Sequence, residues 1–429
     1  MTTELYAIAF KAQRQPKHRF QDLYRLLKTD LLLQSWQQLN KQAAAGLDDI
    51  SITDYQSGLQ ENITRLSTDL KHKRYRASAI KRVFIPKSNG KLRPLGLPTV
   101  EDKVVQQSVS QILQRIWEQD FLPNSYGYRP DKSAHQALHS LKLNLQFKGY
   151  GYIVEADIKG FFDNMDHHWL QRMLEQRIDD KALLSVINQW LKARVKAPDG
   201  EMSKSVSGTP QGGVISPVLA NIYLHYVIDL WFEKKVKPGL KGRAMLIRYA
   251  DDFVVAFQFS NEARCFYQVL PERLKKFGLD VAPDKTHLKS FSRFKPGRKR
   301  NFQFLGFEHY WSKDVQGKPR MRQRTAPKKQ KVALSEYYQW IKMNRSKPLW
   351  EMLPILKRKL TGFRNYFGLP DNSRSLSQLY HHVIGSLYKW LNRRSQRKSY
   401  NWCNFKDMLR YFRIAPMRVS KRTVVVDWY

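Results

Sequence analysis

Two apolar runs of strand composition, interrupted by a pair of aspartates, form the most informative pattern in the chain. Residues 246–257 read L-I-R-Y-A-D-D-F-V-V-A-F. Short apolar runs on either side of a polar interruption predict a β-hairpin with Asp251 and Asp252 at its turn. A similar run at 152–158, Y-I-V-E-A-D-I, places Asp157 at the end of another buried strand. Carboxylates in such surroundings repel one another without a cation, so the pattern favours a metal site over a solvated polar turn.

Apolar residues at helical spacing occupy much of the remaining chain, which predicts an α+β fold. The expected helices cover 20–27, 59–70, 101–121, 133–143, 169–177, 218–226, 262–277, 352–367 and 375–394. Residues 80–97 read as two strands joined by an Asn89-Gly90 turn, which makes a basic hairpin, although a solvated hairpin would also carry lysine. Residues 301–307 have strand composition, and the chain from Lys313 onward reads as helices.

A loop rich in glycine and proline precedes the predicted helix at 218–226. It reads G-T-P-Q-G-G-V-I-S-P over 208–217. Glycines in such a loop bring bare backbone close to a ligand. Ordinary strand-to-helix connections share this composition, so the loop gains meaning from its position between the two strands that carry the aspartates.

The charge of the chain indicates a polyanionic partner. The net charge is +38, from 75 Lys and Arg against 37 Asp and Glu. Residues 313–429 hold 27 Lys and Arg against 6 Asp and Glu, interleaved with aromatic residues, which favours RNA or DNA contact over a solvated helical surface. The sequence shows no amphipathic helix with a clean apolar face, so nucleic acid is favoured over a membrane surface as the polyanionic partner. With nucleic acid as partner, the expected cation is Mg²⁺, which binds one or two carboxylates together with substrate phosphates.

Length and composition predict a globular protein of two or three domains, since the chain has 429 residues and is 42% hydrophobic. No apolar run reaches the roughly 18 residues of a membrane helix, and the N-terminus lacks the order of a signal peptide. We therefore expect an intracellular, cytoplasmic protein. Cys265 and Cys403 are too few and too distant for a zinc ribbon or a disulfide framework.

Six motifs in a fixed order carry a resemblance to a known family. They are I-P-K-x-x-G-K-L-R-P-L (85–95), S-Y-G-Y-R-P (125–130), E-A-D-I-K-G-F-F-D (155–163), G-T-P-Q-G-G-V-I-S-P (208–217), Y-A-D-D (249–252) and F-L-G-F (304–307). This set resembles the reverse transcriptases encoded by bacterial group II introns. L-T-G-F-R-N-Y-F at 360–367, followed by 390–398, looks like the thumb, or maturase (X) domain, of the same family. The resemblance covers roughly residues 35–400.

The resemblance implies a right-hand polymerase with fingers, a palm built on an antiparallel sheet, and an all-α thumb. The implied domains are an N-terminal helical extension (1–80), fingers and palm (81–312), a thumb/maturase domain (313–400) and a short basic tail (401–429). The implied activity is RNA-directed DNA polymerisation with two Mg²⁺ ions, together with binding of a group II intron RNA to assist its splicing and retrohoming. The implied partners are structured intron RNA, an RNA template with a DNA primer, dNTPs and target DNA.

Matching motifs also imply roles for individual residues. Asp157, Asp251 and the backbone carbonyl of Ile158 would bind the metal ions, and Asp252 would be a further catalytic carboxylate. Lys285 is the candidate general acid for pyrophosphate. The residues implied to contact the dNTP are Lys87, Arg93, Phe162 and Gln211. The residues implied to position the primer are Phe304, Leu305, Gly306 and Phe307.

Phe162 is the most specific of these assignments. Its ring would lie under the nucleotide sugar and exclude a 2′-hydroxyl, although core packing also explains a phenylalanine there. Basic residues of the loop at 293–300 and of the thumb are expected to contact RNA through phosphates and shape. These residues are Arg293, Lys299, Arg300, Lys328, Lys329, Arg364, Arg393 and Arg394.

The chain departs from the family in one respect. Many members carry a DNA-binding segment and an H-N-H endonuclease with Cys pairs after the thumb, and no C-x-x-C is present here. We therefore expect no cleavage of the second strand of a DNA target, with priming from another source such as nascent strands at a replication fork. Two other interpretations stay open: a related reverse transcriptase that serves phage defence or CRISPR adaptation, and a non-catalytic RNA-binding splicing cofactor. A viral RNA-dependent RNA polymerase is disfavoured by Phe162.

Overall fold

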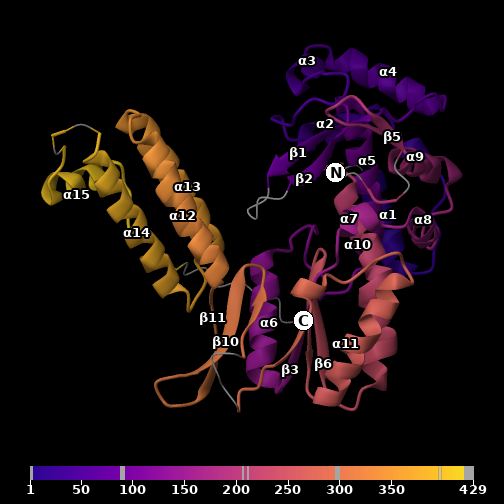
Figure 1. The fold of residues 1–429 in the computed structure, drawn as a ribbon. Coiled ribbons are helices and arrows are strands. Elements are labelled where there is room, and N and C mark those ends of the chain that lie inside the picture. The colour runs from indigo at the N-terminus through magenta and orange to yellow at the C-terminus, as the bar shows by residue number, and fades with distance from the viewer. Residues whose placement is uncertain are drawn as a thin grey trace. The chain divides into compact units, whose positions relative to one another are not determined.

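The computed structural model of the protein describes residues 3–86, 92–204, 207–209, 212–294, 300–394, 396–397 and 399–419. The chain forms two compact units that interleave along the sequence (Figure 1). The first unit comprises residues 1–133, 156–255 and 261–287, and the second comprises 134–155, 256–260 and 288–429. Within the described ranges, none of the helices is both long enough and apolar enough to cross a membrane. The linear four-part domain division stays a prediction.

The first unit is largely helical and surrounds the buried helix α5. Its helices are α1 (Thr3–Arg14), α2 (Thr29–Gln38), α3 (Ile52–Ser57), α4 (Leu59–Lys71), α5 (Val100–Trp117), α7 (Phe161–Asn164), α8 (His167–Leu174), α9 (Lys181–Leu191), α10 (Ser216–Leu224) and α11 (Ser260–Lys275). Thr99 caps α5 by accepting a hydrogen bond from the amide of Asp102. Helices α1, α2 and α10 pack on α5, so residues on nearly all its faces are buried.

The two strands of the predicted basic hairpin are confirmed, whereas the predicted Asn89-Gly90 turn lies outside the described residues. Strands β1 (Ile80–Pro86) and β2 (Leu92–Leu97) pair antiparallel, with Lys81 opposite Leu97 and Pro86 opposite Leu92. Two strands that the sequence pattern did not reveal, β4 (Arg194–Lys196) and β5 (Met202–Lys204), extend the sheet in the order β2-β1-β4-β5. Three-residue strands are too short to show a period, which is why they escaped prediction.

A second sheet has the strand order β6-β7-β3-β8. Its strands are β6 (Ala244–Tyr249), β7 (Asp252–Phe257), β3 (Tyr152–Ala156) and β8 (His287–Ser290). Residues 253–257 of β7 and 153–156 of β3 are buried without alternation. Strands covered on both faces need apolar residues at successive positions, which explains the continuous apolar runs in the sequence.

The predicted helix at 20–27 is wrong in extent, because only a 3₁₀ turn, η1 (Tyr24–Leu26), forms there. Phe20 instead forms a parallel bridge with Ile178, and its amide donates to the carbonyl of Arg177 at 2.7 Å. Long-range pairing therefore overrides the local helical period. After α10, the helix continues as two π-helical segments, η2 (His225–Asp229) and η3 (Phe232–Val236).

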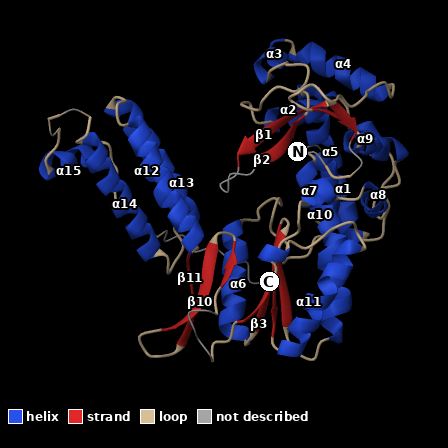
Figure 2. Cartoon of the chain, in the orientation of Figure 1, coloured by secondary structure: helices blue, strands red, loops and turns tan. Residues whose placement is uncertain are grey.

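The second unit joins a helical bundle to a small sheet (Figure 2). Its helices are α6 (Ala134–Lys148), α12 (Pro327–Asn344), α13 (Leu349–Phe367), α14 (Ser373–Leu391) and α15 (Trp402–Tyr411). The sheet has the order β11-β10-β9, with β9 (Phe302–Phe304), β10 (Phe307–Lys313) and β11 (Pro319–Thr325). The expectation of helices from Lys313 onward is wrong for β11, where Met321, Gln323 and Thr325 alternate inward among exposed charges. The tail predicted from 401 contains α15, whose Phe405 is buried in the bundle core.

Candidate active site

Of the two adjacent aspartates predicted at the hairpin turn, Asp251 lies in the turn and Asp252 is the first residue of the strand that follows it. Strand β6 ends at Tyr249 and β7 begins at Asp252, so Ala250 and Asp251 connect them. Ala250 has a φ of 56°, a left-handed conformation that residues other than glycine rarely adopt. Such positions persist only where surrounding contacts hold them. The turn therefore presents Asp251 and Asp252 in a conformation that the rest of the unit imposes.

The third carboxylate, Asp157, directly follows β3. Ile158 forms an antiparallel bridge with Val281, and the amide of Ala282 donates to the carbonyl of Asp157 at 2.8 Å. Backbone groups alternate in direction along an extended strand, so the carbonyl of Ile158 points away from Ala282. This carbonyl is therefore not used by the bridge and is available as an oxygen ligand.

The three carboxyl groups influence one another. Withdrawal from water and the carboxylates of Asp157 and Asp251 raise the pKa of Asp252 to about 7. Withdrawal from water and the charge of Asp157 also raise the pKa of Asp251. Asp252 nevertheless has an exposed edge, and the Asp157 side chain is 14% exposed, so ions can reach the group. Crowded carboxylates of this kind are stabilised by a cation between them.

A cation of the chain already lies in this cluster. Lys285, in the 3₁₀ turn η5 (Pro283–Lys285), places Nζ 2.6 Å from Asp157 Oδ2, and this hydrogen bond raises the pKa of Lys285. In the described part of the chain, no group of three or more His, Cys, Asp or Glu side chains is arranged so that it could hold a metal ion by itself. Mg²⁺ does not require one, because it keeps several waters and takes further ligands from substrate phosphates. The open carboxylate set therefore fits a divalent ion that arrives with its substrate.

A buried ion pair holds the strand that leads into the turn. Arg248 Nη2 lies 2.6 Å from Asp229 Oδ2 and Nε lies 2.8 Å from Oδ1, and both side chains are completely buried. From Nη1 the same guanidinium donates to the carbonyl of Ala250 and to Asn221 Oδ1, each at 3.1 Å. We call Arg248, Asp229 and Asn221 the turn clamp. It ties the left-handed Ala250 to α10 and to the π-helical segment η2.

Gly127, from the S-Y-G-Y-R-P motif, packs against the same turn. Its carbonyl accepts a hydrogen bond from Asn221 Nδ2 at 2.7 Å. A Cβ atom at this position would lie 2.3 Å from the amide nitrogen of Ala250, so a larger residue would displace the turn. The amide of Tyr126 also donates to the carbonyl of Arg248 at 2.9 Å. The S-Y-G-Y-R-P and Y-A-D-D motifs therefore form one packed structure.

Phe162 lies on the short helix α7, where it meets the glycine-rich loop. The amide of Thr209 donates to the carbonyl of Phe162 at 2.7 Å. Gly208 has a φ of 82°, and a Cβ there would lie 2.6 Å from the carbonyl oxygen of Phe162. The Phe162 ring is half-buried, whereas the neighbouring Phe161 is 2% exposed. Phe161 fills the core, and Phe162 is left at the surface of the unit.

Arg93 is the one predicted triphosphate contact within the described residues. It lies on β2 as an exposed side chain, and its charge acts to lower the pKa of Asp251 against the dominant effect of burial. The first unit thus brings together Asp157, Asp251, Asp252, Lys285 and Arg93. Lys87 and Gln211 lie outside the described residues.

Comparison with known protein families identifies the chain. Residues 85–309 match the family model described as reverse transcriptase (RNA-dependent DNA polymerase), which covers more than half of the chain. The chain belongs to the reverse transcriptase family. It is an RNA-directed DNA polymerase, and the carboxylate cluster lies inside the matched region. Residues 331–412 of the reverse transcriptase match a second model, the group II intron maturase-specific domain.

Several curated proteins are similar to this reverse transcriptase. The group II intron-encoded protein LtrA of Lactococcus lactis subsp. cremoris is 28% identical over 460 aligned residues, which cover 87% of this chain and 74% of LtrA. Protein YkfC of Escherichia coli K12 is 33% identical over 238 residues, 49% of this chain and 62% of YkfC. The putative COX1/OXI3 intron 2 protein of Saccharomyces cerevisiae is 31% identical over 213 residues, which cover 50% of this chain and 24% of the yeast protein. The resemblance to group II intron reverse transcriptases is therefore confirmed.

In the second unit, the F-L-G-F residues of the reverse transcriptase form the turn between β9 and β10. Leu305 and Gly306 have φ values of 49° and 76°, as a tight turn requires. Tyr366 donates its hydroxyl to the carbonyl of Leu305 at 3.0 Å, and the rings of Phe307 and Phe367 lie 5.2 Å apart. The C-terminal end of α13 therefore fixes the conformation of this turn.

The predicted RNA-contacting residues of the reverse transcriptase lie in the second unit. The described ones are Arg293, Arg300, Lys328, Lys329, Arg364, Arg393 and Arg394, whereas Lys299 lies outside the described residues. Around Trp390, four cations approach one indole ring at 5.3 to 5.9 Å. They are Lys342, Arg345, Lys389 and Arg393. None of the four is in an ion pair with a described carboxylate. These four cations can therefore bind phosphate groups through charge-assisted hydrogen bonds.

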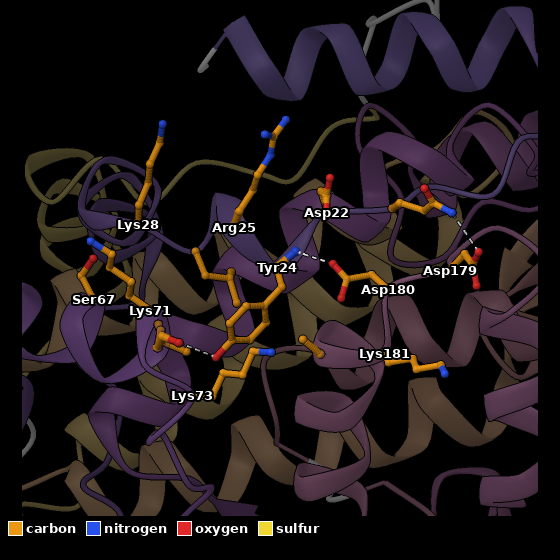
Figure 3. A pocket seen from close by; sticks show the side chains of 14 residues that line it. Asp22, Tyr24, Arg25, Lys28, Ser67, Lys71, Lys73, Asp179, Asp180 and Lys181 are labelled. Atoms are coloured by element: carbon orange, nitrogen blue, oxygen red, sulfur yellow. Dashed lines mark hydrogen bonds between the residues drawn. The ribbon is translucent and has the colours of Figure 1, made fainter.

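A basic cavity of about 690 Å³ lies between the N-terminal segment, α4 and α9 of the first unit (Figure 3). Two of its three carboxylates are engaged locally: Asp180 caps α9 and accepts from the amide of Tyr24 at 2.7 Å, and Asp179 accepts from Gln21. The cations at its wall are Arg25, Lys28, Lys71, Lys73 and Lys181. In Figure 3 these cations diverge rather than converge on one point. This arrangement suits an extended polyanion better than a compact small molecule.

Sequence reasoning missed the turn clamp and Gly127. An arginine inside the apolar run L-I-R-Y and an aspartate inside V-I-D-L-W-F were visible. Charged residues in apolar runs are rarely buried unless they are paired. Arg248 and Asp229 together were therefore the available signal of a buried ion pair. Asp229 is the last residue of the π-helical segment η2, and the sequence pattern reveals neither this segment nor the pairing across 19 residues.

Proposed function

We propose that this reverse transcriptase extends a DNA primer on an RNA template by a two-Mg²⁺ mechanism centred on Asp157 and Asp251. The single observation that supports it is the cluster of three carboxylates at one turn and one strand end, in which burial and the neighbouring carboxylates raise the pKa values of Asp251 and Asp252. Bound Mg²⁺ would supply activation of the primer hydroxyl and charge neutralisation at the phosphates. Asp157, Asp251 and the Ile158 carbonyl would hold the ions.

The remaining residues have positioning and proton-transfer roles in this proposal. Asp252 would tune the charge of the site and hold its neighbours in place. Arg93, together with Lys87, would bind the triphosphate through charge-assisted hydrogen bonds. Lys285 lies within reach of the carboxylates and would donate a proton to the leaving pyrophosphate. Gln211 would contact the nucleotide, and residues 304–307 would position the primer end.

Phe162→Val is expected to admit ribonucleotides. If the ring lies under the sugar, an added 2′-hydroxyl overpacks the site at a cost of about 1–3 kcal/mol, so the preference for dNTPs should fall about tenfold to a hundredfold. Single-nucleotide addition with dCTP and CTP measures it. Phe162→Tyr keeps the ring and should retain discrimination. Unchanged discrimination in Phe162→Val would assign the ring to packing alone.

We further propose that the partner RNA is a group II intron, which the protein helps to splice and to insert into DNA. The maturase-specific match over 331–412 and the four cations around Trp390, which form no ion pair with any carboxylate that the structure describes, support a structured RNA ligand. Purifying the protein from its host at low salt and sequencing the bound RNA tests this. A single RNA that contains or flanks this reading frame supports the proposal. A heterogeneous pool or a small unrelated transcript would instead indicate a reverse transcriptase recruited to defence or CRISPR adaptation.

Arg393→Ala is expected to weaken RNA binding equally for all sequences. Loss of one phosphate contact reduces the slope of log K against log salt by about 1. Filter binding of the co-purified RNA at several salt concentrations measures this slope. Arg410→Ala is the matched control, because Arg410 is exposed but paired with Asp407 at 2.9 Å. An equal change in slope for both variants would count against the Trp390 cluster as a phosphate site.

A further inference from the structure

One residue of the S-Y-G-Y-R-P motif has no role in the function described so far. Tyr128 has a φ of 56° and is 48% exposed. A bulky residue in the left-handed region is a true outlier, and such outliers gather at functional sites. The half-exposed ring also offers little burial in return for this strained conformation.

The residues on both sides of Tyr128 impose its conformation. Before it, Gly127 is seated against the aspartate turn by the hydrogen bond from Asn221. After it, Arg129 donates to the carbonyls of Leu122 (2.7 Å) and Ser125 (2.8 Å). Arg129 also forms a largely buried ion pair with Glu118 at 2.9 Å. With both neighbours held, the backbone conformation of Tyr128 is fixed, and with it the direction of its Cα–Cβ bond.

The Tyr128 ring lies beside Phe162, the residue predicted to contact the nucleotide sugar. Its centroid lies 6.5 Å from that of Phe162 at an interplanar angle of 71°, an edge-to-face pair. Burial and the charges of Asp251, Tyr249 and Asp252 raise the pKa of Tyr128, so its hydroxyl stays protonated near these carboxylates. Phe162 also contacts the buried Phe161 ring, at a centroid distance of 5.3 Å. Phe162 is therefore held between a core ring and the half-exposed ring of Tyr128.

We propose that Tyr128 is a positioning residue for sugar selection, whose ring fixes the orientation of Phe162 under the incoming nucleotide. This inference rests on the proposed role of Phe162. Without the second ring, Phe162 has free volume on its exposed side and can rotate away from a 2′-hydroxyl. Tyr128 therefore sets how strictly the polymerase rejects ribonucleotides, and it acts through the ring rather than the hydroxyl.

The test measures the ratio of kcat/KM for dCTP to that for CTP on one RNA template and DNA primer. Tyr128→Ala is expected to lower this ratio about threefold to tenfold, the range of one edge-to-face pair, chiefly by raising CTP incorporation. Tyr128→Phe keeps the ring and is expected to keep the ratio. Tyr128→Gly removes the ring and also accepts a positive φ freely, so it tests the proposal even if Tyr128→Ala folds poorly.

A double-mutant cycle separates this inference from the role of Phe162. In the Phe162→Val background, Tyr128→Ala is expected to change the ratio no further, because the ring it positions is gone. An unchanged ratio in Tyr128→Ala and Tyr128→Gly overturns the proposal, as does an equal factor in both backgrounds. A parallel loss of dCTP and CTP incorporation also overturns it, because that result indicates contact with the template. If Phe162→Val by itself leaves the ratio unchanged, the proposed role of Phe162 in excluding ribonucleotides is wrong, which is a different outcome from failure of the Tyr128 proposal.

Discussion

Asp251→Asn is expected to reduce Mg²⁺-dependent primer extension by at least about a thousandfold, because the metal contributes several kcal/mol of charge stabilisation at the reacting phosphate. Asparagine keeps the shape of the side chain but removes the charge that attracts the ion. RNA binding should remain near normal, since the residues predicted to contact RNA lie in the second unit, whereas Asp251 lies in the first. Primer extension and filter binding on the same preparation measure both effects.

The same substitution is expected to leave folding intact. Removing one of three crowded carboxylates relieves the repulsion that raises the pKa of Asp252. The Tm of the metal-free variant should therefore equal or exceed that of the parent, as measured by thermal unfolding. Asp284→Asn is the matched control, since Asp284 is an exposed carboxylate beside Lys285 that lies outside the cluster. Surviving extension in Asp251→Asn would refute the catalytic assignment.

Arg248→Met is expected to cost about 3–5 kcal/mol of stability, because it leaves the fully buried Asp229 without its partner. The substitution also removes the donor that holds the Ala250 carbonyl. Displacement of the catalytic turn by about 1 Å should reduce extension by roughly a hundredfold. Chemical denaturation and single-turnover extension measure the two losses separately.

The double variant Arg248→Met/Asp229→Leu distinguishes positioning from folding. Replacing a buried ion pair by apolar residues of similar volume is often neutral for stability, so folding should recover. Extension should not recover, because the Ala250 carbonyl still lacks its donor. Arg177→Met, at the buried pair with Asp120 (3.0 Å) away from the turn, should lose stability without a comparable loss of activity. Recovery of full activity in the double variant would show that the turn clamp serves folding alone.

Local sequence patterns were sufficient to predict the secondary structure where the elements also carry the recognisable motifs. The paired strands at 246–257 and those at 80–86 and 92–97 were predicted correctly, because their residue types specify strands locally. The prediction failed at 20–27, where the pairing of Phe20 with Ile178 competes with a helix. It also failed at β11, whose outward-facing charges concealed the period of a strand. In both places, distant partners decide the backbone conformation.

The sequence by itself determined the family and the α+β class, and it predicted the three aspartates as the catalytic carboxylates, because all of these depend on residue types in a fixed order. Only the tertiary structure decided that Arg248, Asp229, Asn221 and Gly127 converge on one strained turn, and that Tyr128 meets Phe162 edge-on. The physical reason is that a left-handed alanine or tyrosine is unfavourable on its own. Such a conformation exists only when contacts from residues distant in the sequence hold it, and the pattern of residues along the chain does not predict those contacts.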